Sequence, residues 1–184
     1  MIIILCGPSG VGKSYVCNYF TEHLRFIYPV PYTTRHRRTD EIDGKHYHFL
    51  PLENLRVLSD DFKRGYWVNL MGGSWYGYSD QLDHLLQGEN NIILHLQTGL
   101  SKQIKQKYPY AECFFLNYLT EHTMKERILA RTNTEEEYNK RLQFSRNEIK
   151  EGECFLHKLS SDNPHDFVVS IKDFLGIELG VDRH

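Results

Sequence analysis

The residues with the clearest chemical signature are those from Gly7 to Ser14, which read Gly-Pro-Ser-Gly-Val-Gly-Lys-Ser. They follow residues 2–5, an apolar run that reads as a buried strand, and precede residues 14–25, which read as a helix. Glycine at positions 7 and 12 lets the backbone bend so that its amides point at phosphate oxygens. The helix start adds a favourable partial positive charge. This spacing predicts a phosphate-binding loop.

Two side chains at the end of this loop could act on phosphates directly. Lys13 can reach the β- and γ-phosphates of a nucleotide, and the Ser14 hydroxyl can be a ligand of Mg²⁺. We therefore expect a nucleotide and Mg²⁺ as ligands. The expected nucleotide-binding residues are Gly7, Ser9, Gly10, Val11, Gly12, Lys13, Ser14 and Tyr15.

A second cluster of polar and basic residues lies at 33–41 and reads Thr-Thr-Arg-His-Arg-Arg-Thr-Asp-Glu. Within it, Arg35 and Arg38 stand three residues apart. Two guanidinium forks at this spacing suit a dianionic phosphate, to which each can bond in bidentate fashion. The alternative is a solvated basic loop without a ligand.

The composition is that of an ordinary globular protein. The chain has 184 residues, 40% of them hydrophobic and 25% charged, which suits one domain with a real core. The formal net charge of −2 indicates neither a nucleic acid nor a membrane surface as a partner. No apolar run is long enough to span a bilayer, so we expect a cytoplasmic protein.

The cysteines suggest core thiols. Cys6, Cys17, Cys113 and Cys154 are widely spaced, and no Cys-x-x-Cys pair is present, which argues against a zinc site. Cys6 and Cys113 lie in apolar runs and are expected to be buried, in a reducing compartment.

Strands and helices alternate along most of the chain. The expected strands are 2–5, 26–32, 91–96, 111–117 and 157–161, and the expected helices are 14–25, 80–87, 99–107, 120–131, 135–151 and 164–175. Thr120 is a plausible N-cap. The alternation predicts an α/β fold of the P-loop NTPase type, with a parallel sheet and helices on both faces. The phosphate loop would lie at the carboxyl edge of the strands.

Residues 33–80 interrupt this pattern. They contain a short strand at 45–50, a helix at 51–63, and a hairpin formed by 66–71 and 75–78 around a Gly-Gly pair. We therefore expect a small, mostly β domain at 33–80, inserted into a core made of residues 1–32 and 81–184.

Taken together, these motifs resemble the guanylate kinase family over essentially the whole chain. The matching segments are GPSGVGKS, TTR at 33–35 with Arg38 following, Glu-Ile-Asp-Gly-Lys at 41–45, Tyr-His-Phe at 47–49, Tyr-Gly at 76–77, and an arginine-bearing segment. In that family, ATP phosphorylates GMP to GDP. The resemblance implies that the loop holds ATP, that residues 33–80 bind the acceptor, and that a helical lid at about 126–142 closes over the transferring group.

The resemblance also assigns roles to single residues. Arg35 and Arg38 would grip the acceptor's phosphate, and Tyr47 and Tyr76 would donate hydroxyl hydrogen bonds to it. Glu41 would order the basic loop or contact the acceptor, although it could also form a surface ion pair. Ser79 remains as a possible polar contact to the base.

In the lid, Arg127, Arg131 and Arg141 match the family's arginines. Phosphoryl transfer spreads negative charge over the equatorial oxygens, where an arginine can be worth orders of magnitude in rate. We expect Lys13, Arg131 and Arg141 to be catalytic, together with Arg127.

The chain departs from the family where the base is read. The family's glutamate in the strand before Tyr-Gly is missing from residues 67–69, which read Trp-Val-Asn. His95 or Gln97 stands where an aspartate is expected at the end of the third main strand. The serine that precedes TTR is replaced by Pro-Tyr at 31–32. Asn69 and Gln97 could supply amide acceptors instead.

These departures bear on the acceptor. Guanine presents N1–H and N2–H₂ donors, and each lost charged hydrogen bond is worth about 1.5–3 kcal/mol. The leading interpretation is a nucleoside monophosphate kinase, with GMP or dGMP as acceptor and a monomer or homodimer as the assembly. One alternative is a kinase of another phosphorylated small molecule. The other is a non-catalytic module of the same descent that binds a phosphorylated partner. We also expect domain closure on substrate binding.

Overall fold

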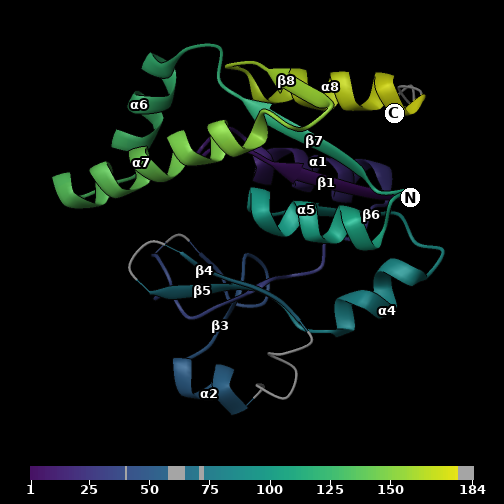
Figure 1. Cartoon of the computed structure of the whole chain (residues 1–184), viewed down its shortest axis with the longest axis horizontal. Coiled ribbons are helices and arrows are strands. Elements are labelled where there is room, and N and C mark those ends of the chain that lie inside the picture. Colours follow the sequence, from purple (N-terminus) through teal and green to yellow (C-terminus); the bar gives the residue numbers. More distant parts are fainter. Residues whose placement is uncertain (40, 58–64, 71–72, 178–184) are drawn as a thin grey trace.

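The structure is a computed structural model that describes residues 1–39, 41–57, 65–70 and 73–177. Within these residues, its strands form two separate four-stranded sheets that lie side by side (Figure 1). We call the sheet that has more residues in its strands the larger sheet, and the other the smaller sheet. The larger sheet carries the phosphate loop. The smaller sheet carries the basic loop.

The larger sheet consists of parallel strands that alternate with helices. Its strand order is β6 (Ile92–His95), β1 (Ile2–Cys6), β7 (Glu112–Asn117) and β8 (His157–Ser160). Ile4 lies beside Leu94 on one side and Cys113 on the other. Every residue of β1 is buried, because a central parallel strand is covered on both faces.

Helices cover both faces of this sheet, which confirms the expected fold class. One apolar cluster joins β1 to α1 (Lys13–Leu24), α6 (Glu121–Leu129) and α8 (Pro164–Leu175). The other cluster joins it to α4 (Gln81–Gln87) and α5 (Thr98–Lys107). The long helix α7 (Glu135–Gly152) packs against both α5 and α6.

Threonine side chains cap the first turns of α6 and α7. Thr120 accepts a hydrogen bond from the backbone of Thr123 at the start of α6, as expected. Thr134 does the same for Glu137 at the start of α7. Each cap satisfies an amide that has no partner within its helix, so the first turn is held in a defined position.

The smaller sheet is mixed and has the order β3 (His48–Phe49), β2 (Tyr32–Thr33), β5 (Ser74–Tyr78) and β4 (Tyr66–Leu70). Strands β4 and β5 are antiparallel, and the short helix α2 (Leu52–Val57) follows β3. This sheet lies below the larger one in Figure 1, with α7 extending over the space between them.

The expected strand at 26–32 is wrong. Arg25 ends α1 in the left-handed conformation, and only Ile27 then joins the larger sheet, through a single bridge to Ile92. Pro29 and Pro31 lack the amide hydrogens that a ladder needs. Strand β2 therefore begins at Tyr32 and belongs to the smaller sheet.

Some expectations fall outside the described residues. They are the end of the helix at 58–63, Gly72 of the hairpin turn, and the chain after residue 177. Among the residues that the structure covers, no helix is long and apolar enough to cross a membrane. The cysteines are free, and Cys6, Cys17 and Cys113 are buried.

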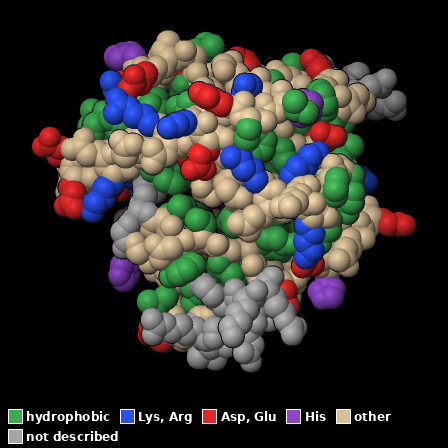
Figure 2. Space-filling view, in the orientation of Figure 1, with side chains coloured by type: hydrophobic (Ala, Val, Ile, Leu, Met, Phe, Trp, Pro, Cys, Tyr) green, Lys and Arg blue, Asp and Glu red, His purple; other side chains and the backbone are tan. Residues whose placement is uncertain are grey.

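Charged side chains of both signs are mixed over the face seen in Figure 2, where lysine and arginine lie among aspartate and glutamate. This matches the small net charge of −2. Several lysine and arginine side chains, in contrast, lie together in the lining of a cavity between the two sheets.

Candidate active site

A cavity of about 430 Å³ lies where the phosphate loop, the smaller sheet, the start of α5 and helix α7 meet. Its polar lining includes Ser9, Lys13, Arg35, His36, Arg38, Tyr47, Ser74, Tyr76, Tyr78, His95, Gln97, Glu137, Lys140, Arg141 and Glu148. Three separate parts of the chain thus direct cationic side chains at one space.

The phosphate loop has the backbone that its glycines predict. Gly7 and Gly12 have φ values of 137° and 120°, which side-chain-bearing residues rarely adopt. A Cβ on Gly7 would lie 2.1 Å from the backbone oxygen of Leu116, so neighbouring strand β7 also requires glycine there. The loop is therefore held closely against the carboxyl ends of β1 and β7.

Lys13 is the central cation of the loop. Its ammonium group donates hydrogen bonds to the backbone oxygens of Gly7 at 2.6 Å and Pro8 at 2.8 Å. Burial lowers the pKa of Lys13, and the nearby carboxylate of Glu148 opposes this shift. The side chain is thus folded over the concave side of its own loop, where phosphate oxygens could replace the two carbonyls.

Ser14 and Tyr15 are both exposed at the start of α1. The Ser14 hydroxyl fits the donor set of Mg²⁺, which takes a small number of protein oxygens and completes its shell with phosphate oxygens and water. Tyr15 lies farther along, and its hydroxyl is 3.3 Å from Nδ1 of His165 on α8. It does not line the cavity.

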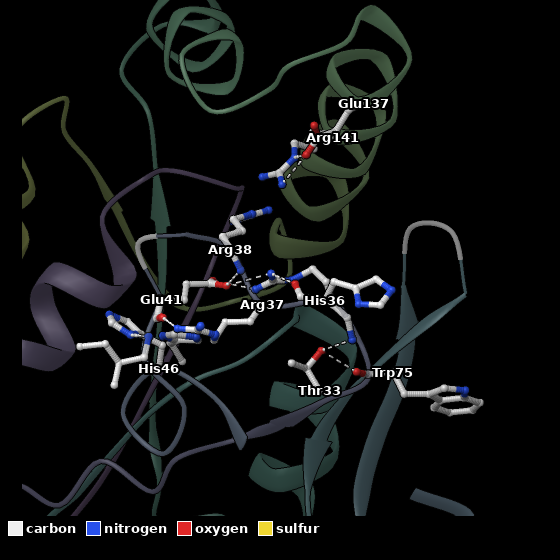
Figure 3. A network of polar contacts seen from close by, with 12 residues as sticks. Thr33, His36, Arg37, Arg38, Glu41, His46, Trp75, Glu137 and Arg141 are labelled. Carbon is white, nitrogen blue, oxygen red and sulfur yellow. Dashed lines mark hydrogen bonds and ion pairs between the residues drawn. The ribbon is translucent and has the colours of Figure 1, made fainter. Parts of the chain in front are cut away.

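The basic loop is ordered by an acidic residue. The Glu41 carboxylate accepts hydrogen bonds from both terminal nitrogens of Arg35 and from the backbone amide of Arg38, the last at 2.9 Å. Figure 3 shows this network and the Arg38 side chain extending from it. Glu41 thus forms an ion pair with Arg35 and links it to the backbone of Arg38, and its role toward the acceptor stays a prediction.

We call Arg35 and Arg38 together the clamp, and Tyr47 and Tyr76 lie beside it. Their rings are 5.9 Å apart, and the Arg35 guanidinium lies 5.5 Å from the centre of the Tyr47 ring. Burial raises the pKa of Tyr47 to about 12. The phenol is therefore protonated at neutral pH and can donate a hydrogen bond into the cavity.

Arg141 faces the clamp from α7. Its side chain is nearly buried and donates to the Glu137 carboxylate at 2.8 and 3.0 Å. In Figure 3, the Arg38 guanidinium points toward that of Arg141 across the space between the basic loop and α7. Two like charges directed at each other favour an anion between them.

The other two arginines expected in a lid, Arg127 and Arg131, are not among the residues that line this cavity. Arg127 donates to the backbone oxygens of Gly10 and Asp162 and stacks over Tyr118. Arg131 is exposed and lies near Gly10 of the phosphate loop. Both flank the loop, whereas Arg141 alone of the three lines the cavity.

On β4, the structure corrects the expected base contact. Val68 and Leu70 line the cavity, while Asn69 between them is exposed and donates to the backbone oxygen of Gly73. Alternate residues of a strand face opposite sides, so Asn69 points away. Ser79 is also outside the lining, and its carbonyl instead begins the turn that leads into α4.

At the end of β6, Gln97 lines the cavity but is engaged in capping. Its side-chain oxygen accepts from the amides of Gly99 and Leu100, which fixes the start of α5. His95 lies near the Tyr28 hydroxyl, and burial lowers its pKa to about 3. The imidazole is neutral at physiological pH and does not replace an acidic group.

Sequence reasoning missed two buried polar residues of α7. Glu148 accepts hydrogen bonds from the amide and hydroxyl of Thr98, and Ser145 accepts one from the amide of Ser9. They follow Arg141 at helical spacing, so they share its face of the helix. That periodicity was a usable signal, since a polar residue on an inward face requires a partner.

The parallel sheet, the glycine loop after its first strand and the cation-lined cavity define a P-loop kinase. The guanylate kinase family model matches residues 1–178. The chain belongs to the guanylate kinase family, whose members are nucleoside monophosphate kinases.

Individual relatives agree with this assignment. The chain is 30% identical over 186 residues to a guanylate kinase of Halalkalibacterium halodurans, covering 100% of this chain and 84% of that protein. It is 31% identical over 153 residues to one from Desulfitobacterium hafniense, covering 82% and 76%. The crystal structure of the guanylate kinase from Anaplasma phagocytophilum superposes with a TM-score of 0.75 at 19% identity, covering 99% of this chain and 87% of that one.

Proposed function

We propose that this protein transfers the γ-phosphoryl group of ATP to the phosphate of a nucleoside monophosphate, GMP or dGMP. One observation carries the proposal. Lys13 of the phosphate loop, Arg35 and Arg38 of the basic loop, and Arg141 of α7 line the same cavity. A donor phosphate on the loop and an acceptor phosphate in the clamp would meet there, with their charges neutralised from three directions.

Each part of the chain has a distinct task in this mechanism. The loop amides and Lys13 would hold the donor phosphates, and the Arg35 fork with Tyr47 would orient the acceptor phosphate. Arg141 would stabilise charge on the transferring group. No general base is required, because the acceptor phosphate is already anionic.

A divalent ion is part of the proposal. Mg²⁺ bound to Ser14 and to the nucleotide would neutralise phosphate charge. Within the described residues, no cluster of acidic, histidine or cysteine side chains could hold a metal by itself. The nucleotide would therefore have to supply most of the ligands.

The side of the cavity formed by β4 supports a second candidate function, a kinase of another phosphorylated small molecule. Val68 and Leu70 face it from β4 and offer guanine no hydrogen-bond acceptor. Its described carboxylates, Glu137 and Glu148, are bonded to Arg141 and Thr98. A kinase that acts on another phosphorylated small molecule would use the same clamp without needing to read guanine.

The decisive experiment is a coupled ADP-release assay with Mg-ATP against a panel of ribo- and deoxynucleoside monophosphates. Turnover with GMP or dGMP supports the proposal, and turnover only with another acceptor favours the second candidate. Lys13→Ala is the matched control, since it removes the loop's ammonium. A binding module would keep its phosphorylated partner in this variant, whereas a kinase loses its activity.

We further propose that the protein acts in the cytoplasm, where its free buried thiols stay reduced, and as a monomer or homodimer. Size-exclusion chromatography with light scattering measures the assembly, and cell fractionation measures the location.

A further inference from the structure

One face of α7 carries a row of polar residues that connects the cavity with the phosphate loop. Its members are Glu137, Arg141, Ser145 and Glu148, at spacings of four, four and three residues. Such spacings place side chains above one another on a helix. Arg141, Ser145 and Glu148 are each almost fully buried.

The row touches the phosphate loop at Ser145. The Ser145 hydroxyl oxygen accepts a hydrogen bond from the backbone amide of Ser9 at 3.2 Å. Ser145 is 0% exposed, so this contact is shielded from water. It lies one helical turn from Arg141, which means that the loop and the arginine are linked through a rigid element.

The row is anchored to the core at Glu148. Its carboxylate accepts from the Thr98 amide at 3.1 Å and from the Thr98 hydroxyl at 2.8 Å, at the start of α5. This double contact is independent of the loop. The buried face of α7 thus has a double contact at Glu148 and a single hydrogen bond at Ser145, while Arg146 on its exposed side binds Glu121 of α6.

We propose that Ser145 is a positioning residue that holds the Ser9 amide until a nucleotide phosphate takes it, so that ATP binding releases α7 to move Arg141 over the cavity. The proposal rests on the proposed function, in which the loop amides bind phosphate. An amide donates one hydrogen, so a phosphate oxygen and the Ser145 hydroxyl compete for Ser9. Glu148 would stay bonded to Thr98 and act as the pivot.

This competition predicts that loss of the Ser145 hydroxyl raises the affinity for nucleotide, which a purely structural role of Ser145 does not predict. Removing the hydroxyl leaves the Ser9 amide without this partner in the free protein, while the nucleotide-bound protein loses nothing. Ser145→Ala should therefore bind a non-hydrolysable ATP analogue about two- to tenfold more tightly, the range that one hydrogen bond supplies. A residue that merely supported the fold would weaken binding or leave it unchanged.

The test measures analogue affinity by calorimetry in the wild type, Ser145→Ala, and Gln143→Ala as a matched control on the exposed side of α7. Alanine favours helix, so both variants should fold, which thermal melting checks. Hydrogen exchange of residues 135–145 gives the second readout. Exchange should rise on analogue binding in the wild type and be raised already in free Ser145→Ala.

Unchanged or weaker analogue binding in folded Ser145→Ala overturns the proposal, as does exchange in α7 that ignores both nucleotide and mutation. Tighter binding in Ser145→Ala alone, with raised exchange, supports it. If the wild type does not bind the analogue at all, the proposed function fails and this inference fails with it. If the wild type binds and Lys13→Ala does not, a silent Ser145→Ala refutes this inference alone.

Discussion

The Glu41 carboxylate binds both terminal nitrogens of Arg35, with N–O distances of 2.9 and 2.7 Å. Both side chains are mostly shielded from solvent, so the pair holds the arginine in one orientation. A planar fork fixed in this way can present its remaining N–H groups to a phosphate with little further loss of side-chain entropy.

Arg35→Lys should therefore raise the acceptor KM by about tenfold or more, because an ammonium group cannot reproduce the two-sided geometry. The ATP KM should change much less, since the phosphate loop is separate from the clamp. Steady-state kinetics with each substrate varied in turn measures both. Arg37→Lys is the matched control in the same loop, as Arg37 does not line the cavity. Equal effects of the two variants would contradict the assignment.

Leu70→Glu should increase the preference for GMP. Leu70 faces the cavity, so a carboxylate there could accept from the guanine N–H groups, and a charged hydrogen bond corresponds to about tenfold or more in kcat/KM. Asn69→Glu introduces the same charge on the opposite face of β4 and should leave the preference unchanged. Ratios of kcat/KM for GMP and AMP provide the measurement. A gain in both variants, or in neither, would show that this side of the cavity does not contact the base.

Gly7→Ala should destabilise the fold far more than Gly176→Ala. Both glycines have positive φ, at 137° and 64°, so each alanine costs about 1–2 kcal/mol of backbone strain. At Gly7 the new Cβ meets a backbone atom, the Leu116 oxygen, whereas at Gly176 it meets no atom of the described residues within 4 Å. Urea unfolding should give a loss for Gly7→Ala of at least about twice that for Gly176→Ala. Comparable losses would mean that the loop can shift away from β7.

Asp83 joins three elements and should make stability depend on pH. It accepts hydrogen bonds from the hydroxyls of Tyr66 on β4 and of Tyr108, the residue after α5, and it pairs with Lys107 of α5. Although burial opposes it, these donors hold the pKa of Asp83 below its ordinary value. Its contribution is thus fully present above the unfolded-state pKa near 4 and is lost as pH falls through the lower folded-state value.

Asp83→Asn should accordingly lower the free energy of unfolding by about 1.5–3 kcal/mol at neutral pH, the usual value of a hydrogen bond to a charged group. The difference from the wild type should shrink as the pH falls below the unfolded-state pKa near 4, because the unfolded chain then takes up a proton that folded Asp83 resists. Urea titrations at neutral pH and in acid test this. A difference that grows in acid would reverse the assigned sign.

The parts of the fold that sequence predicted are those with strong local signals. The glycine loop, the apolar strand runs and the Thr120 cap each depend on residues close together in the chain. The failure at residues 26–32 has a local reason as well: Pro29 and Pro31, which limit the regularity of any strand, remove the ladder donors, and the apolar pattern outweighed them in the prediction. On β4, a shift of one residue in register exchanges the two faces of the strand. The sequence did not determine this register, and the structure shows that Leu70 faces the cavity and Asn69 does not.

The candidate site was predictable in its phosphate-binding parts and less so elsewhere. Lys13, Arg35 and Arg38 stand in motifs whose chemistry can be read directly, and the structure lines one cavity with them. The contacts of Ser145 and Glu148 join positions separated by 136 and 50 residues along the chain, so only the fold reveals their partners. Their functional roles, like those of Arg127 and Arg131, stay predictions.

The way in which the smaller sheet is attached has a mechanical consequence. The chain leaves the larger sheet after Ile27, which is fixed to Ile92, and returns through α4, which Asp83 fixes to α5. Asp83 also binds Tyr66 of β4, so the smaller sheet is held to α4 and α5 at one edge. We expect the smaller sheet to turn about this edge, and the parts farthest from α4 would then travel the greatest distance (Figure 1). Leverage would convert a small angular change at the attached edge into a large change in the width of the cavity.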